Sequence, residues 1–406
     1  MAGVTISALS GDNGILQNAG NAKEVNEKAA DIEKIKLAIT EAQIGENGYQ
    51  ELTTYNLGYE LIKDGTKAIV SDNEDGTRHI LFLDEKKEYS LDNNGNIEDL
   101  NIDFDTKYVA PESQDEERNE GVIGIGTDGQ PVDMDLWEYN FDDVTNGYGL
   151  NDSTSLTAGS SAVSSKGYNG MDFDNIVIPQ YISTDDGESW TPVTNLDWSF
   201  YNCTNLEQLS ELPDTVKSMR FTFRGCTNLD EICELPNGLE NMLGTFMLSG
   251  ITKAPITPQS VNNMEGTFNA CSSLIEPPVI PNGVTSLKIT FANCIALKYA
   301  PNIPDSVETM ESTFEGCTSL ETATTIPSSV TNIIKTYRGC TNLRGKLEIN
   351  ANVSGKTFLG DDGYERLDYF NVVYNATKEG LSLKLSGSCR FLNEIITETK
   401  NPRITL

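Results

Sequence analysis

An aromatic side chain recurs along this chain at almost constant spacing, and that regularity constrains the fold more than any other feature. Successive members stand 23, 23, 22, 23, 23 and 23 residues apart. A unit of this length has too few apolar side chains to bury its own face, so neighbouring units must stack and share one core. The spacing therefore predicts a solenoid of seven 22–23-residue units over residues 193–343. The aromatic residues are Phe200, Phe223, Phe246, Phe268, Phe291, Phe314 and Tyr337.

Four other apolar positions keep the same phase. A Val or Leu lies seven residues before each aromatic residue, and a Leu, Met or Ile lies four residues before it. A Cys follows three residues after it, with Ser249 in the third unit, and a Leu comes three residues later, with Thr252 as the exception. Side chains repeated in this way form interior ladders when units stack. The expected thiol ladder is Cys203, Cys226, Cys271, Cys294, Cys317 and Cys340, and the expected leucine ladder is Leu206, Leu229, Leu274, Leu297, Leu320 and Leu343.

The even spacing of six of the eight cysteines favours a structural role. Disulfide frameworks join loops at irregular intervals, and zinc sites need close Cys pairs with His ligands, whereas His79 is the one histidine here. We expect the thiols to act as small apolar groups with a weak donor, and we expect neither metal nor cofactor. Most units also carry a Leu-Pro or Ile-Pro step, which we expect to end one strand per unit because proline cannot donate to a ladder.

The combined pattern resembles the BspA-like leucine-rich repeat of bacterial surface antigens. The register V-x-x-M-x-x-T-F-x-G-C-T-N-L-x(5)-L/I-P is met with one change from Val307 to Pro327, and the resemblance covers roughly residues 193–343. In this chain the Pro stands one position later after the Cys than is usual in the family. The resemblance implies a bacterial cell-surface or extracellular protein that adheres to a protein or glycan and is not an enzyme.

Flanking segments are expected to cover the two apolar ends of the solenoid. Residues 121–192 indicate a β-rich N-terminal cap, and residues 344–406 indicate a β-rich C-terminal cap. A Ser-rich loop is expected at Ser153–Ser165, and a short helix at Phe391–Thr399. Strands are expected at Val122–Ile125, Ile176–Ile178, Lys346–Val353, Leu381–Leu385 and Arg403–Leu406.

Three glycines of the first cap satisfy the G-x-G-x-x-G motif, namely Gly124, Gly126 and Gly129. A dinucleotide site needs this motif to open a helix directly after a strand. Here Asp128-Gly129 is a hairpin signal and Pro131 follows it, so the motif indicates a turn instead of a phosphate site.

Residues 1–104 indicate a long helix followed by a small antiparallel sheet. Apolar residues recur at three- and four-residue steps within residues 14–45, and Asp75-Gly76 and Asn94-Gly95 separate the strand-like runs as hairpin turns. The helical stripe is expected to contain Ala22, Val25, Ala29, Ile32, Ile35 and Ile39. The strand-like runs are Lys67–Val70, Arg78–Leu83 and Glu88–Leu91.

The opening string Ala2–Leu16 resembles type IV prepilin-like proteins of Gram-positive bacteria, which implies a pilin-like stem over residues 1–104. The chain lacks that family's basic-Gly cleavage site and most of its apolar half-helix. Either the sequence begins downstream of the natural start, which we favour, or this protein does not enter filaments. Membrane anchoring or filament packing would therefore depend on a missing N-terminal helix. The charged residues 105–120 indicate a linker between stem and cap.

The formal net charge of −32, from 29 Lys and Arg against 61 Asp and Glu, argues against a nucleic-acid partner. His79 is expected at an ordinary strand position, and Asp92-Asn94-Asn96 is expected to be a hairpin turn instead of a calcium loop because Ile97 replaces the required Gly. Three functions remain: an adhesin, a structural pilin-like or secretion subunit in which the repeats are a spacer, and, least favoured, a hydrolase. For the adhesin, the expected contact residues are Glu207, Gln208, Asp230, Glu231, Lys298, Tyr299, Glu321 and Thr322.

Overall fold

The computed structural model forms two units, Met1–Lys107 and Tyr108–Leu406, each described by itself. No helix among the described residues has the length and apolar character needed to cross a membrane. The structure describes residues 15–45, 48–49, 51–73, 75–101, 122–132, 134–137, 139–142, 147–149 and 176–351, together with the short strands 358–359, 365–366, 381–385 and 404–405.

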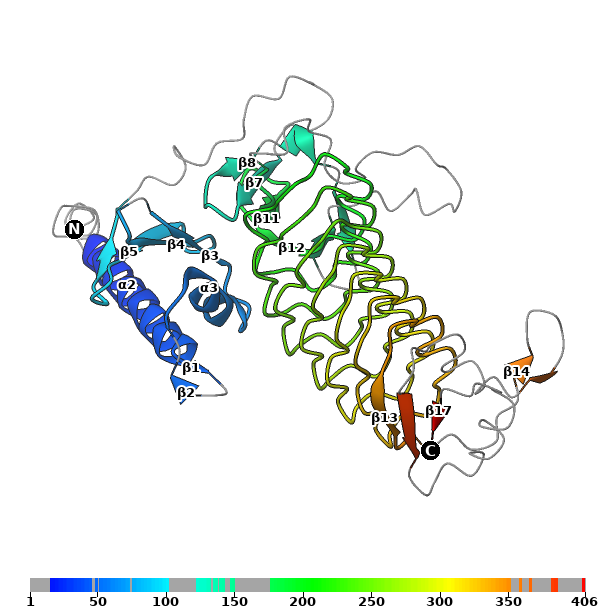
Figure 1. The fold of residues 1–406 in the computed structure, drawn as a ribbon. Coiled ribbons are helices and arrows are strands. Elements are labelled where there is room, and N and C mark those ends of the chain that lie inside the picture. The colour runs from blue at the N-terminus through cyan, green and yellow to red at the C-terminus, as the bar shows by residue number, and fades with distance from the viewer. Residues whose placement is uncertain are drawn as a thin grey trace, which may run out of the picture. The chain divides into compact units, whose positions relative to one another are not determined.

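The first unit packs a long helix and a short helix against an antiparallel sheet (Figure 1). The sheet has the order β3-β4-β5-β6, and its apolar side chains Ile80, Phe82 and Leu91 meet Ile35 and Leu57 of the helices in one core. The helices are α2 (Ile15–Ala42) and α3 (Thr54–Ile62), and the strands are β3 (Ala68–Asp72), β4 (Arg78–Phe82), β5 (Lys87–Leu91) and β6 (Ile97–Asp99), with the small pair β1 (Ile44–Gly45) and β2 (Gly48–Tyr49).

Both expected hairpin turns are present in this unit. Gly76 and Gly95 have φ of +83°, a conformation that glycine adopts without steric cost. The Asp92 carboxylate accepts the backbone N–H groups of Asn94 and Asn96, each at 2.8 Å. The side-chain amide of Asn96 and these backbone donors lower the pKa of Asp92. The carboxylate thus closes the turn between β5 and β6.

The apolar stripe of α2 is shorter than the sequence predicts. Ile35 is fully buried, whereas Ala22, Val25 and Ala29 are exposed, Val25 at 66%. The buried Asp31 instead accepts the Tyr89 hydroxyl at 2.9 Å. The prediction was wrong for Ala22, Val25 and Ala29, because the first buried residue among the described side chains of α2 is Asp31.

The first part of the second unit is a six-stranded sheet of order β8-β7-β11-β12-β10-β9. Its last strand in sequence, β12, leads directly into the first repeat. Trp137 belongs to the core that this sheet shares with the repeats and meets Phe200 edge to face, with ring centroids 5.9 Å apart. The strands are β7 (Ile123–Gly126), β8 (Pro131–Val132), β9 (Asn140–Asp142), β10 (Gly147–Gly149), β11 (Pro179–Ser183) and β12 (Thr191–Asn195), with the 3-10 helix η1 (Met134–Leu136).

The glycine motif of this sheet is a hairpin, as expected. β7 and β8 are antiparallel, and Gly129 between them has φ of +71°. A Cβ on Gly124 would collide with Met134, and one on Gly126 would collide with Val177. The absence of a side chain at the first two glycines therefore lets Met134 and Val177 pack against β7.

The repeats form a stack of coils without extended strands between β12 and β13 (Figure 1). We call residues 193–343 the repeat stack. The expected strand per unit is reduced to single-residue parallel bridges, such as Asn195 with Ser218 and Ser218 with Asn241. The proline does not end a strand: the Pro213 carbonyl accepts the Val216 N–H at 3.1 Å and closes a turn. The structure therefore corrects the expected role of the Leu-Pro step.

Backbone hydrogen bonds between coils replace the missing strands. In the first coil, alternate N–H groups donate to carbonyls of the second coil, and the pattern continues to the seventh coil. The intervening N–H groups turn back within their own coil, as in Ser199 to Leu196 at 3.1 Å. This alternation places two left-handed residues in each coil, at the second position before and the second position after the aromatic residue. In the first coil they are Trp198 and Asn202.

The C-terminal part contains a parallel sheet of order β13-β16-β17. These strands overlap the three segments expected there, and β13 begins one residue earlier than expected: β13 (Gly345–Ile349), β16 (Leu381–Leu385) and β17 (Ile404–Thr405), with a separate pair β14 (Phe358–Leu359) and β15 (Glu365–Arg366). The segments Ala2–Leu16 (except its last two residues), 105–120, Ser153–Ser165 and Phe391–Thr399 lie outside the described residues.

Candidate binding surface

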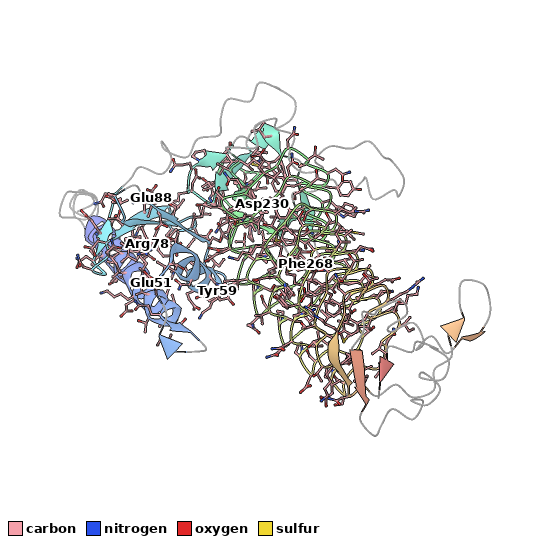
Figure 2. All side chains as sticks on the ribbon, viewed as in Figure 1. Glu51, Tyr59, Arg78, Glu88, Asp230 and Phe268 are labelled. Carbon is pink, nitrogen blue, oxygen red and sulfur yellow. The ribbon has the colours of Figure 1, made fainter. Side chains whose placement is uncertain are left out.

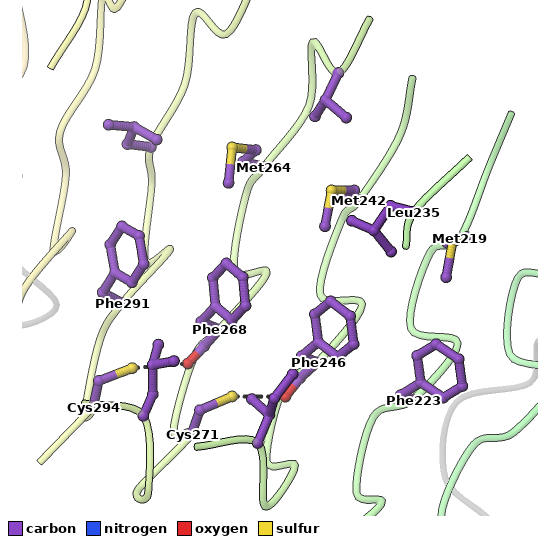
Figure 3. Close-up of a cluster of buried hydrophobic side chains, with 14 of the residues drawn as sticks. Met219, Phe223, Leu235, Met242, Phe246, Met264, Phe268, Cys271, Phe291 and Cys294 are labelled. Atoms are coloured by element: carbon purple, nitrogen blue, oxygen red, sulfur yellow. Dashed lines mark hydrogen bonds between the residues drawn. The ribbon is translucent and has the colours of Figure 1, made fainter. Parts of the chain in front are cut away.

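The interior of the repeat stack is a column of parallel aromatic rings (Figure 3). From Phe200 to Phe314, neighbouring ring centroids are 5.6 Å apart with interplanar angles of 2–13°. Tyr337 ends the column 5.3 Å from Phe314. At 5.6 Å, the rings are offset in the manner that aromatic quadrupoles favour. Every ring is fully buried, so the column is scaffold and offers no contact to a ligand.

The cysteines form a second interior column with a defined hydrogen bond. The Cys271 thiol donates to the Phe246 carbonyl at 2.8 Å, and Cys294 donates to Phe268 at 3.0 Å (Figure 3). Burial raises the pKa of the Cys271 and Cys317 thiols to about 12. Reactive cysteines need the opposite shift, toward a stable thiolate. The seven described cysteines are all free thiols.

The leucine column is continuous through the third coil, where the sequence showed an exception at Thr252. Ile251, five residues after Phe246 instead of six, is fully buried and belongs to the same core. This coil lacks one residue, so its backbone comes closer to the second coil, and a Cβ on Gly250 would collide with the Thr227 carbonyl. Gly250 therefore permits the shorter unit. The six expected leucines, Leu206, Leu229, Leu274, Leu297, Leu320 and Leu343, are all buried.

A fourth interior column, which is polar, was not anticipated from the sequence. The residue before each aromatic residue is Thr in six units and Ser199 in the first, and all seven are buried. The Thr290 hydroxyl donates to the Met264 carbonyl at 3.0 Å, and Thr313 donates to Leu287 at 2.9 Å. The signal in the sequence was the Thr that recurs before each ring. A hydroxyl buried in every coil needs a hydrogen-bond partner in every coil, which predicts a column.

The expected contact residues lie on the outside of the coils. Glu207, Gln208, Asp230 and Glu231 are exposed, and Asp230 is marked in Figure 2. Lys298, Tyr299 and Thr322 are also exposed, while Glu321 is half-buried. Tyr299 and Thr322 form a bridge between coils, as do Lys253 and Glu276 at the equivalent position. The residues therefore follow one another from coil to coil as a column whose charge and size vary.

A second surface feature lies on the first two coils and was missed by the sequence reasoning. Trp198 contacts Tyr201 and Phe221, with ring centroids 5.0 and 4.6 Å apart. The Arg224 guanidinium lies over Tyr201 and Phe221, at 5.5 and 5.8 Å from their centroids. All four side chains are partly exposed. We call Trp198, Tyr201, Phe221 and Arg224 the aromatic platform.

A buried carboxylate supports the arginine beside this platform. Asp197 accepts the Ser218 hydroxyl at 2.7 Å and the Arg220 backbone N–H at 2.6 Å. Its other oxygen accepts Arg220 Nε at 2.5 Å, and the Arg220 side chain remains 45% exposed. Arg220 is thus held in place at the surface.

His79 stands in β4, as expected, within a buried polar group. Its Nε2 lies 2.7 Å from the Glu88 carboxylate, and its Nδ1 lies 3.5 Å from the Ser71 hydroxyl. The strands β3, β4 and β5 bring the three side chains together, and bonds on both sides hold the ring within the sheet. Among the residues that the structure describes, no group of three or more His, Cys, Asp or Glu is arranged to hold a metal ion.

A comparison with protein-family models identifies the repeats. The family model described as BspA type leucine rich repeat region matches in six copies, over residues 196–321 and 265–358. No curated protein matches the chain.

Three solved structures of bacterial proteins are similar. A T. pallidum leucine-rich-repeat protein is 22% identical, with 53% of this chain and 83% of that chain covered and a TM-score of 0.32. A Bacteroides ovatus leucine-rich-repeat protein is 18% identical, covering 53% and 70%, with a TM-score of 0.29. A leucine-rich cell-surface protein of Faecalibacterium prausnitzii is 14% identical, covering 60% and 97%, with a TM-score of 0.17. Because these TM-scores are below 0.5, the assignment rests on the family match: the repeat stack is a BspA-type leucine-rich-repeat region.

Proposed function

We propose that this chain is a non-catalytic bacterial cell-surface protein whose leucine-rich repeats bind an extracellular protein or glycan. One observation carries the proposal: the interior positions repeat from coil to coil, whereas the exposed positions change in charge and size. A repeating interior gives a rigid support, and variable exposed side chains on such a support are how solenoid proteins distinguish partners.

The interior is unsuited to chemistry, which supports a binding role. Burial raises the pKa of the interior thiols, so they stay protonated, and their hydrogens are committed to backbone carbonyls. The buried threonine hydroxyls are committed in the same way. The groups able to meet a partner are therefore those on the outside of the coils.

Binding of the full chain to arrays of extracellular proteins and glycans tests this function. We expect at least one ligand whose affinity falls when exposed stack residues change, for example in the double variant Asp230→Ala with Glu231→Ala. The matched control is Glu98→Ala in β6, which should leave that affinity unchanged. Failure of the full chain to bind any array member would contradict the proposal.

The location is tested separately, by protease treatment of intact cells and immunolabelling. A surface protein is digested and labelled without permeabilisation, whereas an internal one is protected.

A structural, pilin-like role is the alternative, and the first unit favours it. A 28-residue helix beside a small antiparallel sheet is the stem architecture that the N-terminal resemblance implies. In this case the repeats would be a spacer, and any membrane anchoring would come from an apolar helix before residue 1. Recovery of the native protein from sheared, purified filaments would support this role, and its presence only outside filaments would oppose it.

A further inference from the structure

We propose that the aromatic platform, Trp198, Tyr201, Phe221 and Arg224, binds a carboxylated pyranose sugar, such as a uronic or sialic acid residue of a glycan. The inference rests on the proposed function and names both the place on the repeat stack and the ligand class.

Two platform residues, Trp198 and Phe221, occupy a left-handed position that is least strained with glycine. The second position before the aromatic residue is left-handed in every coil, with φ of +66° at Trp198 and +53° at Phe221. This conformation costs a residue with a Cβ about 1–2 kcal/mol relative to glycine. The third and fourth coils use glycine at this position, and the last three carry other non-aromatic residues: Gly244, Gly266, Ile289, Ser312 and Lys335. An aromatic residue stands there only in the first two coils, which backbone geometry does not explain.

The surrounding coil makes room for these rings. A Cβ on Gly244 would collide with the Phe221 ring, so the glycine of the third coil allows that ring to lie across it. Trp198 in turn packs on Phe221 with an interplanar angle of 35°. The rings overlap from one coil to the next and give a supported surface instead of separate mobile side chains.

The platform combines aromatic rings with a cation that has no carboxylate partner. Arg224 makes no ion pair among the described residues and is held instead by the faces of Tyr201 and Phe221. Lys217 and Arg220 stand in the same coil, and both are exposed. Arg220 is paired with Asp197, so Lys217 and Arg224 are the cations of this coil without a carboxylate partner among the described residues, and in a chain with a net charge of −32 they favour an anion here.

A carboxylated sugar satisfies both features within a single residue. The C–H bonds on one face of a pyranose ring pack on aromatic rings, and a guanidinium binds a carboxylate through paired hydrogen bonds. Arg224 lies 5.5 Å from the Tyr201 centroid, and Tyr201 lies 5.0 Å from Trp198, so the cation and the Trp198 ring both adjoin Tyr201. An acidic peptide would need two residues with fixed spacing to make the same contacts, which favours the sugar.

Calorimetric titration of the full chain tests the proposal. The probes are an oligogalacturonate tetramer, sialyllactose, neutral lactose and a polyglutamate peptide. The first two distinguish uronic from sialic acid as the source of the carboxylate. We expect at least one of them to bind at least tenfold tighter than lactose, and this difference should shrink in 0.5 M salt because the contact is ionic.

Two platform variants and one matched control locate the site. We expect Trp198→Gly and Arg224→Gln each to weaken binding of the carboxylated sugar at least tenfold. Trp198→Gly keeps a residue suited to the left-handed backbone, so its melting temperature should remain close to that of the parent chain. Arg338→Gln is the control, because Arg338 holds the same coil position in the seventh unit and pairs with Glu315 at 3.1 Å. It should change the affinity less than twofold.

The outcomes separate this proposal from the function on which it rests. Carboxylated sugars that bind no better than lactose, or whose binding survives both platform variants, would overturn the platform assignment. Platform-dependent binding of polyglutamate but of neither sugar would overturn it in favour of a peptide site. In these cases another ligand found on the arrays would leave the proposed function intact. Absence of any ligand for the full chain would overturn both.

Discussion

The two units of this protein build their cores in opposite ways. In the first unit each contact occurs once: the Tyr89 hydroxyl reaches Asp31, 58 residues away, and Tyr89 meets Phe82 edge to face. In the repeat stack one contact recurs, so that Phe223 meets Phe200 as Phe314 meets Phe291. A recurring contact places every interior residue in the same environment. The stack should therefore respond to a change of chemistry at all coils together, whereas the first unit should respond residue by residue.

The largest expected effect is a loss of stability of the repeat stack in alkali. A free thiol titrates near 9.0, whereas burial raises the pKa of Cys271 and Cys317 to about 12 and that of Cys226, Cys294 and Cys340 well above 9.0. Above pH 9 the unfolded chain releases protons that the folded chain retains, so the free energy of unfolding falls as pH rises. The contribution is fully present below pH 9.

Thermal unfolding between pH 8 and 10 measures this effect. The decrease of the melting temperature with pH should be less steep in Cys271→Ser, which keeps a hydroxyl donor but removes one titrating group. The first unit has no described cysteine, so its melting temperature should change little over the same pH interval. A stack whose melting temperature is flat from pH 8 to 10 would show that the thiols are not buried as a column.

Removal of one ring is the next largest effect. Phe268→Ala takes out a fully buried side chain in the middle of the aromatic column. Such changes typically cost about 3–5 kcal/mol. Denaturant unfolding should show this loss in the stack, while Phe82→Ala, the counterpart in the first unit, should destabilise only that unit. A loss below about 1 kcal/mol for Phe268→Ala would contradict a shared column.

A smaller effect is expected for the buried threonine ladder. Thr313→Val preserves shape but removes the side-chain donor of the Leu287 carbonyl, which keeps the Thr290 N–H. The expected loss is about 0.5–1.5 kcal/mol, the net contribution of one hydrogen bond. Thr331→Val is the matched control, because Thr331 is exposed and its hydroxyl bond to Glu308 is long, at 3.3 Å. Equal effects of the two changes on the unfolding free energy would argue against the ladder.

The smallest effect is a gain. Leu248 is 45% exposed and has φ of +62°, so Leu248→Gly should stabilise the stack by up to about 1 kcal/mol. Leu248→Ala removes the same side chain without relieving the backbone and should give no gain. If alanine and glycine raise the melting temperature equally, the left-handed conformation is not the cause.

Repetition explains how much of the stack could be predicted from the sequence. Seven copies identify the aromatic, thiol and leucine columns even though the third unit departs from them. The sequence alone did not show what replaces the leucine in the third unit. A count of six residues from Phe246 reaches Thr252, whereas this coil is one residue shorter and buries Ile251 instead. The left-handed positions were marked only in part: glycine occupies one column at Gly244 and Gly266 and the other at Gly225, Gly316 and Gly339, and the remaining coils carry other residues there.

The first unit offers one copy of each signal, and prediction was less complete there. α3 was missed because its capping box pairs Thr53 with Asn56 and not with the more familiar Glu or Gln. The hairpins were found because Asp-Gly and Asn-Gly turns depend on local backbone preference alone. The aromatic platform was missed for another reason: Trp198 meets Phe221, and Tyr201 meets Arg224, only through the stacking of coils.

The direction of the hydrogen bonds between coils has a consequence for assembly. Around each aromatic residue the N–H groups of a coil donate toward the C-terminal neighbour, whereas N–H groups elsewhere in the coil, such as those of Lys217 and Asp230, donate toward the N-terminal neighbour. Both ends of the stack therefore carry donors and acceptors, but in opposite places along the coil. An end segment fitted to one terminus would meet donors where the other terminus presents acceptors. Two stacks stripped of those segments would join head to tail by repeating the contact between coils, and because such a contact does not close on itself they would propagate as fibres.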